Sequence, residues 1–272
     1  MTVGVYAFAT QDYKEKDYPL DLWLEHNLLV FDQIAVVKYD CDFPLPVDNK
    51  KVIQAVIKSP ERSTFRFFRL GKQTAMRLLS TDWKVLLDID EFVWPVPDFD
   101  NLDKTKTYRL RCRALWGSMK TEIVEYGLAH SSPRVHFGDV PILRDGEAGG
   151  NKGGVIGQFW HTNGLRTRES LFAKWAAIRN DFASERLVRN GAFPTSALRF
   201  EDYSRTFPNA YLRNVCLCDL PKVLAENRVR FNDEELRALR DGSLKELCLR
   251  ELRIPRYLAQ RIKNTILKRH RY

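Results

Sequence analysis

The stretch WKVLLDIDEF, residues 83–92, decides the fold of this chain. An apolar run that ends in acidic residues is typical of a buried strand with polar side chains at its carboxyl end. Because side chains alternate along a strand, we expect Asp88 and Asp90 on one side and Ile89 in the core. Two carboxylates held together repel each other and lose hydration, and a divalent cation relieves both costs. The stretch therefore predicts an Mg²⁺ or Mn²⁺ site, with solvated capping acids as the alternative.

Upstream of this stretch, the sequence alternates between strand and helix patterns. Apolar, β-branched runs predict strands over residues 3–9 and 34–39, and apolar residues at helical spacing predict helices over 21–31 and 65–80. This order predicts parallel βαβ units, whose ligands bind outside the carboxyl ends of the strands. The strand ends therefore bring residues 10–12, Asp40 and residues 88–91 to one edge of the sheet.

Downstream, the pattern becomes mixed. Residues 108–116, 134–137 and 155–161 predict further strands. The glycine-rich segment GEAGGNKGG, residues 146–154, predicts a mobile loop. Residues 233–270 have a helical pattern throughout.

The run WKVLLDIDEFVWP, residues 83–95, resembles the metal-binding strand of GT-A-type glycosyltransferases, in the family-2-like group with a DxDEF motif. Three further blocks resemble that group in the expected order. They are DLWLEHNLLVFDQIAVVKYD (21–40), RLGKQTAMRLLSTDW (69–83) and FWHTNGLRTRESLFAKW (159–175). Several ordered blocks are more specific than one DxD motif.

The resemblance implies an α/β fold of the GT-A type, in which a Rossmann-like, mixed sheet flanked by helices binds a nucleotide sugar. It implies a metal-dependent hexosyltransferase whose donor is a nucleotide sugar, with a UDP-sugar favoured. Residues 1–220 would form the catalytic domain. Residues 221–272 would form a basic helical C-terminal extension, for which the resemblance offers no counterpart.

The resemblance also assigns the metal site. Asp90 would be the main ligand of Mn²⁺ or Mg²⁺, and Asp88 would contact the ribose, or the metal through water. His161 would complete the metal shell, since neutral imidazole is a suitable ligand for Mn²⁺. The alternative for His161 is a core histidine at the end of a strand.

The donor would occupy the carboxyl edge of the sheet. The residues expected to lie around its base, ribose and pocket are Thr10, Asp12, Asp40, Arg69 and Gln73. Arg166, Arg168 and Lys174 are candidates for the leaving diphosphate, because basic side chains compensate phosphate charge. Their alternative is a solvated basic helix face.

Direct displacement at the sugar needs a carboxylate near the acceptor hydroxyl. The candidates for this role are Glu91, Asp139, Asp145 and Glu147, and Glu91 would alternatively orient the metal site. Asp145 and Glu147 border the glycine-rich segment, which would close over the donor. A retaining reaction would not need the base in the same place, so inversion and retention both stay open.

Most of the formal net charge of +9 lies in the last twenty residues. Residues 253–272 contain no acid and seven basic residues, which are Arg253, Arg256, Arg261, Lys263, Lys268, Arg269 and Arg271. Leu258, Ile262 and Ile266 recur every four residues, which predicts an amphipathic helix. Such a helix would bind an anionic membrane surface, bind DNA phosphates or pack on the body.

These observations leave three functions open. An envelope glycan or lipid-linked saccharide is the favoured acceptor. The alternatives are a phage-type DNA glycosyltransferase acting on a hydroxymethylated base, and a non-catalytic nucleotide-sugar or nucleic-acid binding protein on the same fold. No apolar run approaches the length of a membrane span, and the five cysteines show no paired spacing, so we expect a cytoplasmic protein, peripheral at the inner membrane surface.

Overall fold

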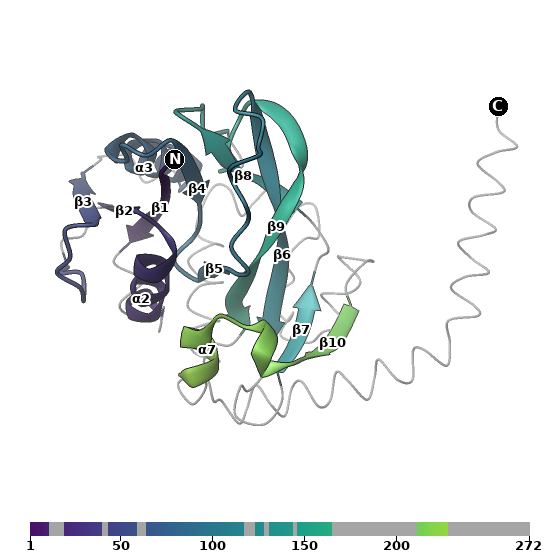
Figure 1. Cartoon of the computed structure of the whole chain (residues 1–272). Helices are drawn as coiled ribbons and strands as arrows, with labels where there is room; N and C mark the ends of the chain where they lie inside the picture. Colours follow the sequence, from purple (N-terminus) through teal and green to yellow (C-terminus); the bar gives the residue numbers. More distant parts are fainter. Residues whose placement is uncertain are drawn as a thin grey trace, which may run out of the picture.

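A mixed sheet of ten strands forms the centre of the protein in the computed structural model (Figure 1). The structure describes residues 1–10, 19–39, 43–58, 64–116, 123–127, 131–143, 146–164 and 211–227. Together the strands and helices form an α/β fold, as the sequence predicts.

One half of the sheet is parallel. Its strands are β1 (Val3–Thr10), β2 (Gln33–Tyr39), β3 (Val52–Ile57) and β4 (Trp83–Leu86). They lie in the order β3-β2-β1-β4, so the chain moves outward from β1 and then returns to the other side of β1. The order therefore reverses between β1 and β4, which is where open α/β sheets bind ligands.

Two helices cover opposite faces of this half. They are α2 (Leu20–Val30) and α3 (Thr64–Leu78). Strand residues alternate between them: Val5 and Ala7 belong to the core on the α2 side, and Tyr6 and Phe8 to the core on the α3 side. Gly71 lets α3 approach β1 closely, because a Cβ there would lie 2.1 Å from Cδ2 of Phe8.

The other half of the sheet is mainly antiparallel. Its strands are β5 (Glu91–Val93), β6 (Lys106–Trp116), β7 (Ile123–Gly127), β8 (Ser131–Phe137), β9 (Asn151–Gly164) and β10 (Tyr211–Val215). Antiparallel pairing of β8 with β4 joins the two halves. The long β9 pairs in parallel with β6 and in antiparallel with β5.

Half of the glycine-rich segment differs from the sequence prediction. Residues 151–154 are not a mobile loop but the first residues of β9, where Asn151 pairs with Lys106 of β6. Glycine is needed at position 153 for packing, because a Cβ there would lie 2.6 Å from Cδ1 of Tyr108. The glycine content, which suggests a mobile loop, thus allows two strands to pack closely at this position.

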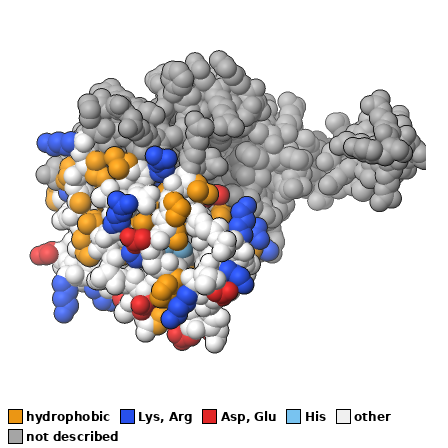
Figure 2. Space-filling model, turned by 90° about the horizontal axis from the view of Figure 1, so that it is seen from above, with side chains coloured by type: hydrophobic (Ala, Val, Ile, Leu, Met, Phe, Trp, Pro, Cys, Tyr) orange, Lys and Arg blue, Asp and Glu red, His pale blue; other side chains and the backbone are white. Residues whose placement is uncertain are grey.

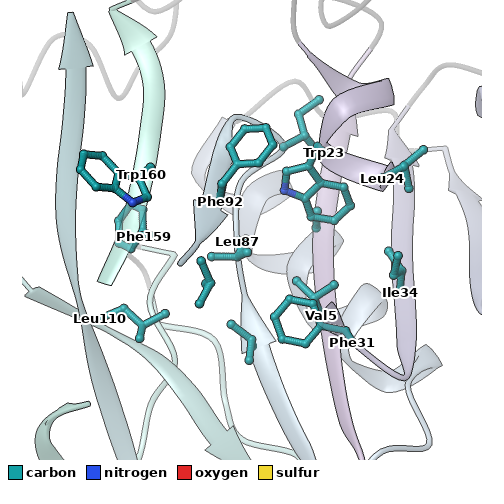
Figure 3. Packing of buried hydrophobic residues seen from close by; sticks show 14 of the residues in the cluster. Val5, Trp23, Leu24, Phe31, Ile34, Leu87, Phe92, Leu110, Phe159 and Trp160 are labelled. Atoms are coloured by element: carbon teal, nitrogen blue, oxygen red, sulfur yellow. The ribbon is translucent and has the colours of Figure 1, made fainter. Parts of the chain in front are cut away.

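The largest core lies between α2 and the two halves of the sheet. Figure 3 shows Trp23 of α2 beside Phe92 of β5, and Phe159 and Trp160 of β9 belong to the same cluster of buried residues. A 3₁₀ turn, η1 (Leu217–Asp219), and the short helix α7 (Lys222–Glu226) follow β10. Val223 of α7 is buried in this core, so the first residues of the expected extension pack on the body.

Residues 228–272, which include the expected basic helix, lie outside the described residues. None of the described helices is long and apolar enough to cross a membrane. On the face shown in Figure 2, lysine and arginine side chains are spread over the described part and interleaved with hydrophobic and acidic ones.

Candidate functional site

The acidic residues lie on a turn at the switch point of the sheet. Strand β4 ends at Leu86, and the chain then turns, with the backbone N–H of Glu91 donating to the carbonyl of Asp88 at 3.0 Å. The expected strand alternation therefore does not govern this segment. The Asp88 side chain keeps 37 % of its exposure and the Asp90 side chain only 3 %, so the two carboxylates have different surroundings and different partners.

Asp90 faces His161. The antiparallel pairing of β5 and β9 sets Glu91 opposite His161, and Oδ2 of Asp90 lies 3.3 Å from Nε2 of His161. Thr162 fixes the backbone here, since its N–H and hydroxyl donate to the Asp90 carbonyl at 2.9 and 3.2 Å. Burial lowers the pKa of His161, but the Asp90 carboxylate outweighs burial and raises it to about 10. The site therefore stabilises a positive charge beside Asp90.

Glu91 forms the most complete ion pair of the site. Its Oε2 and Oε1 accept from the two terminal nitrogens of Arg134 on β8, at 2.8 and 3.0 Å. Oε2 also accepts from the backbone N–H of Asp88 at 2.7 Å. Burial raises the pKa of Glu91, and the positive charge of Arg134 opposes that rise. With both oxygens engaged, Glu91 shapes the turn and is not placed to act as an acceptor base.

Helix α2 holds β5 from the other side. The indole N–H of Trp23 donates to the Glu91 carbonyl at 3.0 Å, and Nε2 of His26 lies 3.0 Å from the Val93 carbonyl. Burial lowers the pKa of His26, so this neutral ring donates Nε2–H. Strand β5 is thereby fixed by β9 on one edge and by two side chains of α2 on the other.

Asp88 pairs with a lysine of α3. Nζ of Lys72 lies 3.0 Å from Oδ1 of Asp88, and the Lys72 side chain is 8 % exposed. Burial would raise the pKa of Asp88, but the charges of Lys72 and Arg134 outweigh burial and lower it. The glycine-rich segment passes this pair, because a Cβ built at Gly146 would lie 3.2 Å from Nζ of Lys72. Gly146 has a φ of +75°, which favours glycine.

The arrangement is compatible with a divalent cation held by few protein ligands. Among the described residues, the His, Cys, Asp and Glu side chains form no group of three or more around one point. Asp90 and His161 supply two adjacent donors, and Asp88 lies on the same turn. Mg²⁺ typically takes one or two carboxylates and completes its shell with phosphate oxygens and water. Asp90 and His161 could therefore hold such a cation only together with ligands from outside this pair.

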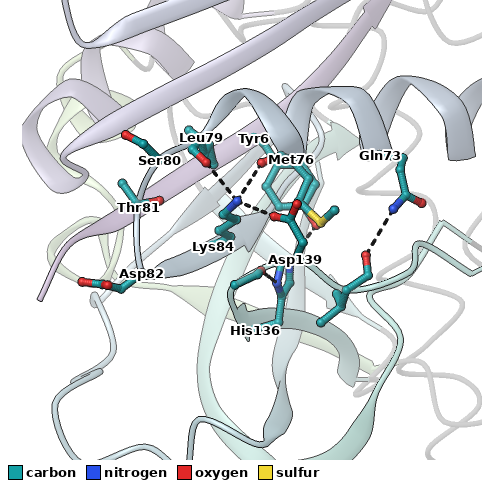
Figure 4. A network of polar contacts seen from close by, with 12 residues as sticks. Tyr6, Gln73, Met76, Leu79, Ser80, Thr81, Asp82, Lys84, His136 and Asp139 are labelled. Carbon is teal, nitrogen blue, oxygen red and sulfur yellow. Dashed lines mark hydrogen bonds and ion pairs between the residues drawn. The ribbon is translucent and has the colours of Figure 1, made fainter.

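The structure does not bring Asp139 to this site. Asp139 forms an ion pair with Lys84, near the beginning of β4, whereas the acidic turn follows the end of that strand (Figure 4). Nζ of Lys84 also donates to the carbonyls of Met76 and Leu79, at 3.0 and 2.9 Å. Asp139 thus compensates a buried lysine that caps the end of α3, and its expected role as a base is not supported by its position.

One predicted residue of α3, Gln73, makes two hydrogen bonds to the backbone of the segment that follows β8. The Gln73 side chain donates to the Val140 carbonyl at 3.4 Å and accepts from the Ile142 N–H at 3.2 Å. Arg69 is exposed on α3. Thr10 is the last residue of β1, at the edge where the acidic turn lies, and Glu147 is half-buried next to Gly146. The predicted residues outside the described part of the chain are Asp12, Asp40, Asp145, Arg166, Arg168 and Lys174.

Sequence reasoning missed two residues that structure the site. Lys72 occupies the apolar stripe of α3, three, four and seven positions before Ala75, Met76 and Leu79, which are buried. A lysine on such a stripe is a signal that the sequence does carry. Arg134 begins a predicted strand, and nothing local indicates its partner, because Glu91 lies 43 positions away.

No protein-family model matches the sequence, and no curated protein is detectably similar to it.

Proposed function

We propose that this protein is a metal-dependent glycosyltransferase of the GT-A type, which transfers a hexose from a nucleotide-sugar donor to a hydroxyl acceptor. One observation carries the proposal: Asp90 and His161, from distant parts of the sequence, have side chains 3.3 Å apart at the reversal of the strand order. The motif resemblance assigns both residues to the same metal. An α/β sheet with acidic residues at this point supports nucleotide binding there.

The chemistry needs a stable diphosphate leaving group. A bound Mn²⁺ or Mg²⁺ would neutralise the charge that develops on the diphosphate, and Asp90 and His161 would hold that ion. Glu91 would keep the turn in place through Arg134. Of the expected bases, Asp145 and Glu147 flank Gly146, which lies beside the Lys72–Asp88 pair. Glu147 belongs to the described residues, so it is the first residue to test for an inverting reaction.

A hydroxyl of an envelope glycan or lipid-linked saccharide is the acceptor that we favour, and a UDP-sugar is the favoured donor. Transfer of labelled sugar to a membrane glycan fraction, compared with hydroxymethylated DNA, would distinguish the two acceptor classes. Transfer to DNA alone would contradict the favoured acceptor and leave the reaction class in place.

The reaction class is tested by release of UDP or GDP from a panel of nucleotide sugars with Mn²⁺. We expect release by the full-length protein and its loss in Asp90→Ala and His161→Ala, because each removes a donor for the metal. Arg77→Ala, which changes an exposed residue in the last turn of α3, is the control and should retain activity. If no donor is turned over and Asp90→Ala leaves nucleotide binding unchanged, the proposal is wrong and a non-catalytic role would replace it.

A further inference from the structure

Two of the cysteines lie at the protein surface with a single residue between them. Cys216 and Cys218 are both exposed, whereas Cys112 is buried in the largest core. Free cysteine is among the most buried residue types, because its thiol behaves as a small apolar group. Packing therefore gives a reason for Cys112 but none for the exposed pair, so the reason has to be sought in the chemistry of the two thiols.

The chain turns tightly at this pair. Strand β10 ends at Val215, η1 begins at Leu217, and the backbone N–H of Asp219 donates to the Cys216 carbonyl at 3.0 Å. A turn closed by such a bond sets the Cα atoms of Cys216 and Cys218 roughly 5–6 Å apart. Disulfide bonds join cysteines whose Cα atoms are about 4.4–6.8 Å apart. The backbone therefore has the separation that a bond between these two cysteines needs.

The two thiols are also in contact. A hydrogen bond with the Cys216 side chain is the main cause that raises the pKa of the Cys218 thiol, and the Asp219 carboxylate adds to the rise. Sγ of Cys218 lies 4.0 Å from Oδ1 of Asp219. The pair thus combines a suitable backbone separation with two sulfur atoms on the same side of the turn.

Both sides of the turn are anchored in the fold (Figure 1). Before the turn, Val215 of β10 pairs with Ile123 of β7. After the turn, Leu220 and Leu224 are buried in the largest core. Groups that are held in place before they bond lose less conformational freedom when they do so. The fold therefore favours a bond between these two cysteines.

Two other roles suit the pair less well. A structural zinc ion takes four ligands, and among the described residues no three His, Cys, Asp or Glu side chains surround one point. A permanent structural disulfide contributes most when it closes a long loop, whereas this bond would close a loop of three residues. Exposed disulfides are instead the ones that are readily reduced, as in regulatory and catalytic pairs.

We propose that Cys216 and Cys218 form a reversible redox site, a surface dithiol that a small disulfide of the glutathione type oxidises to an intramolecular disulfide. One protein thiol loses its proton and its sulfur attacks the small disulfide, which releases one small thiol and leaves a mixed disulfide. The second protein thiol then displaces the other small thiol and closes the bond. Overall, the protein gives up two hydrogens with two electrons, and one small disulfide becomes two thiols. In a reducing compartment the dithiol is the resting form.

Trypsin digestion reports the state of this pair directly. Cleavage after Arg213 and Lys222 releases residues 214–222, which contain both cysteines and no other. The folded, full-length protein is equilibrated with glutathione and glutathione disulfide, quenched with acid, alkylated, digested and analysed by mass spectrometry. We expect a peptide that is two hydrogens lighter than the dithiol form and free of alkylation. Dithiothreitol should restore two alkylation sites.

Two single variants are the matched controls. Cys216→Ser and Cys218→Ser each keep one exposed thiol, so their peptides should lose the intramolecular disulfide and carry at most one glutathione. Both positions are exposed, so we expect both variants to fold. The inference is overturned if the wild-type peptide carries two glutathiones or two alkyl groups at every glutathione ratio and never the intramolecular bond.

Unfolding the protein tests the contribution of the turn. In urea the two cysteines are no longer held by β10 and the largest core, so the disulfide should need a higher proportion of glutathione disulfide than in the folded protein. Equal proportions would show that the fold does not favour the bond and would contradict the inference. The measurement uses neither metal nor nucleotide, so failure of the redox site and failure of the proposed function are distinguishable.

Discussion

The Glu91–Arg134 pair is the residue-level feature on which the geometry of the acidic turn depends most. Removing one partner of a buried ion pair leaves an uncompensated charge, so Glu91→Ala should lower the free energy of unfolding by about 3–5 kcal/mol. Arg134 would then face Phe159 without its carboxylate. Urea denaturation followed by circular dichroism measures the loss.

The double variant Glu91→Leu, Arg134→Met is the matching control for this prediction. Replacing both charges by apolar groups of similar size removes the unpaired charge, so the double variant should recover most of the stability lost in Glu91→Ala. Nucleotide binding should stay weak in both, because the Asp88 N–H has lost its acceptor. Additive losses in the double variant would show that the pair is not coupled as the structure indicates.

At this scale, the sequence predicts which residues lie together at the acidic turn better than which contacts each of them makes. The DxDE stretch identifies the acidic turn, and the resemblance adds His161, which the structure places against Asp90. The assignment of Glu91 as a possible base could not be corrected from the sequence, since its partner Arg134 arrives through strand pairing. Asp139 shows the same limit, because its pairing with Lys84 depends on the register of β8 against β4.

At the scale of elements, the attachment of α2 to β5 links two motifs of the sequence. Trp23→Phe keeps most of the buried ring but leaves the Glu91 carbonyl without its donor. The substitution should therefore lower the free energy of unfolding by about 1–2 kcal/mol more than the same substitution at a tryptophan whose indole N–H makes no hydrogen bond. Trp83→Phe is the matched comparison, because Trp83 is equally buried and its Nε1 has no hydrogen-bond partner among the described residues.

Chemical denaturation of both variants decides this prediction. Trp23→Phe should also weaken Mn²⁺–UDP binding, because β5 carries the residues next to Asp90, whereas Trp83→Phe should leave it unchanged. Equal losses of stability in the two variants would mean that the bond from α2 to β5 contributes nothing.

Sequence periodicity predicts the strands well where both faces of a strand are buried. Strands β1 and β2 alternate between two cores, and their apolar runs were sufficient to predict them. Residues 52–57 are only partly buried, and their pattern is too weak to separate strand from helix. Residues 151–154 could not be predicted as a strand, because Gly153 reflects the close approach of Tyr108 rather than local conformation.

At the scale of the whole molecule, the charge is divided between body and tail. Residues 253–272 carry seven of the basic residues and no acid, so deleting them should weaken binding to anionic vesicles or to DNA, more so at low salt. Nucleotide affinity and thermal stability should be unchanged, because the acidic turn and its partners lie in the described body. Vesicle co-sedimentation and DNA mobility shifts measure the effect.

The two binding assays also separate the acceptor classes. A selective loss of vesicle binding would support an acceptor at a membrane surface, and a selective loss of DNA binding would support the nucleic-acid alternative. If the truncated protein unfolds, the tail is part of the packed body and its expected role in recruitment is wrong.

The pairing of the two sheet halves determines when the acidic turn acquires its partners during synthesis of the chain. The acidic turn emerges during synthesis well before its partners, with Arg134 following Glu91 by 43 positions and Thr162 following Asp90 by 72. Domains made on the ribosome begin to fold from the N-terminal side. The parallel half can therefore form early, while its carboxylates remain hydrated. The nascent protein sets His161 beside Asp90 only when β9 has left the exit tunnel and docked on β5.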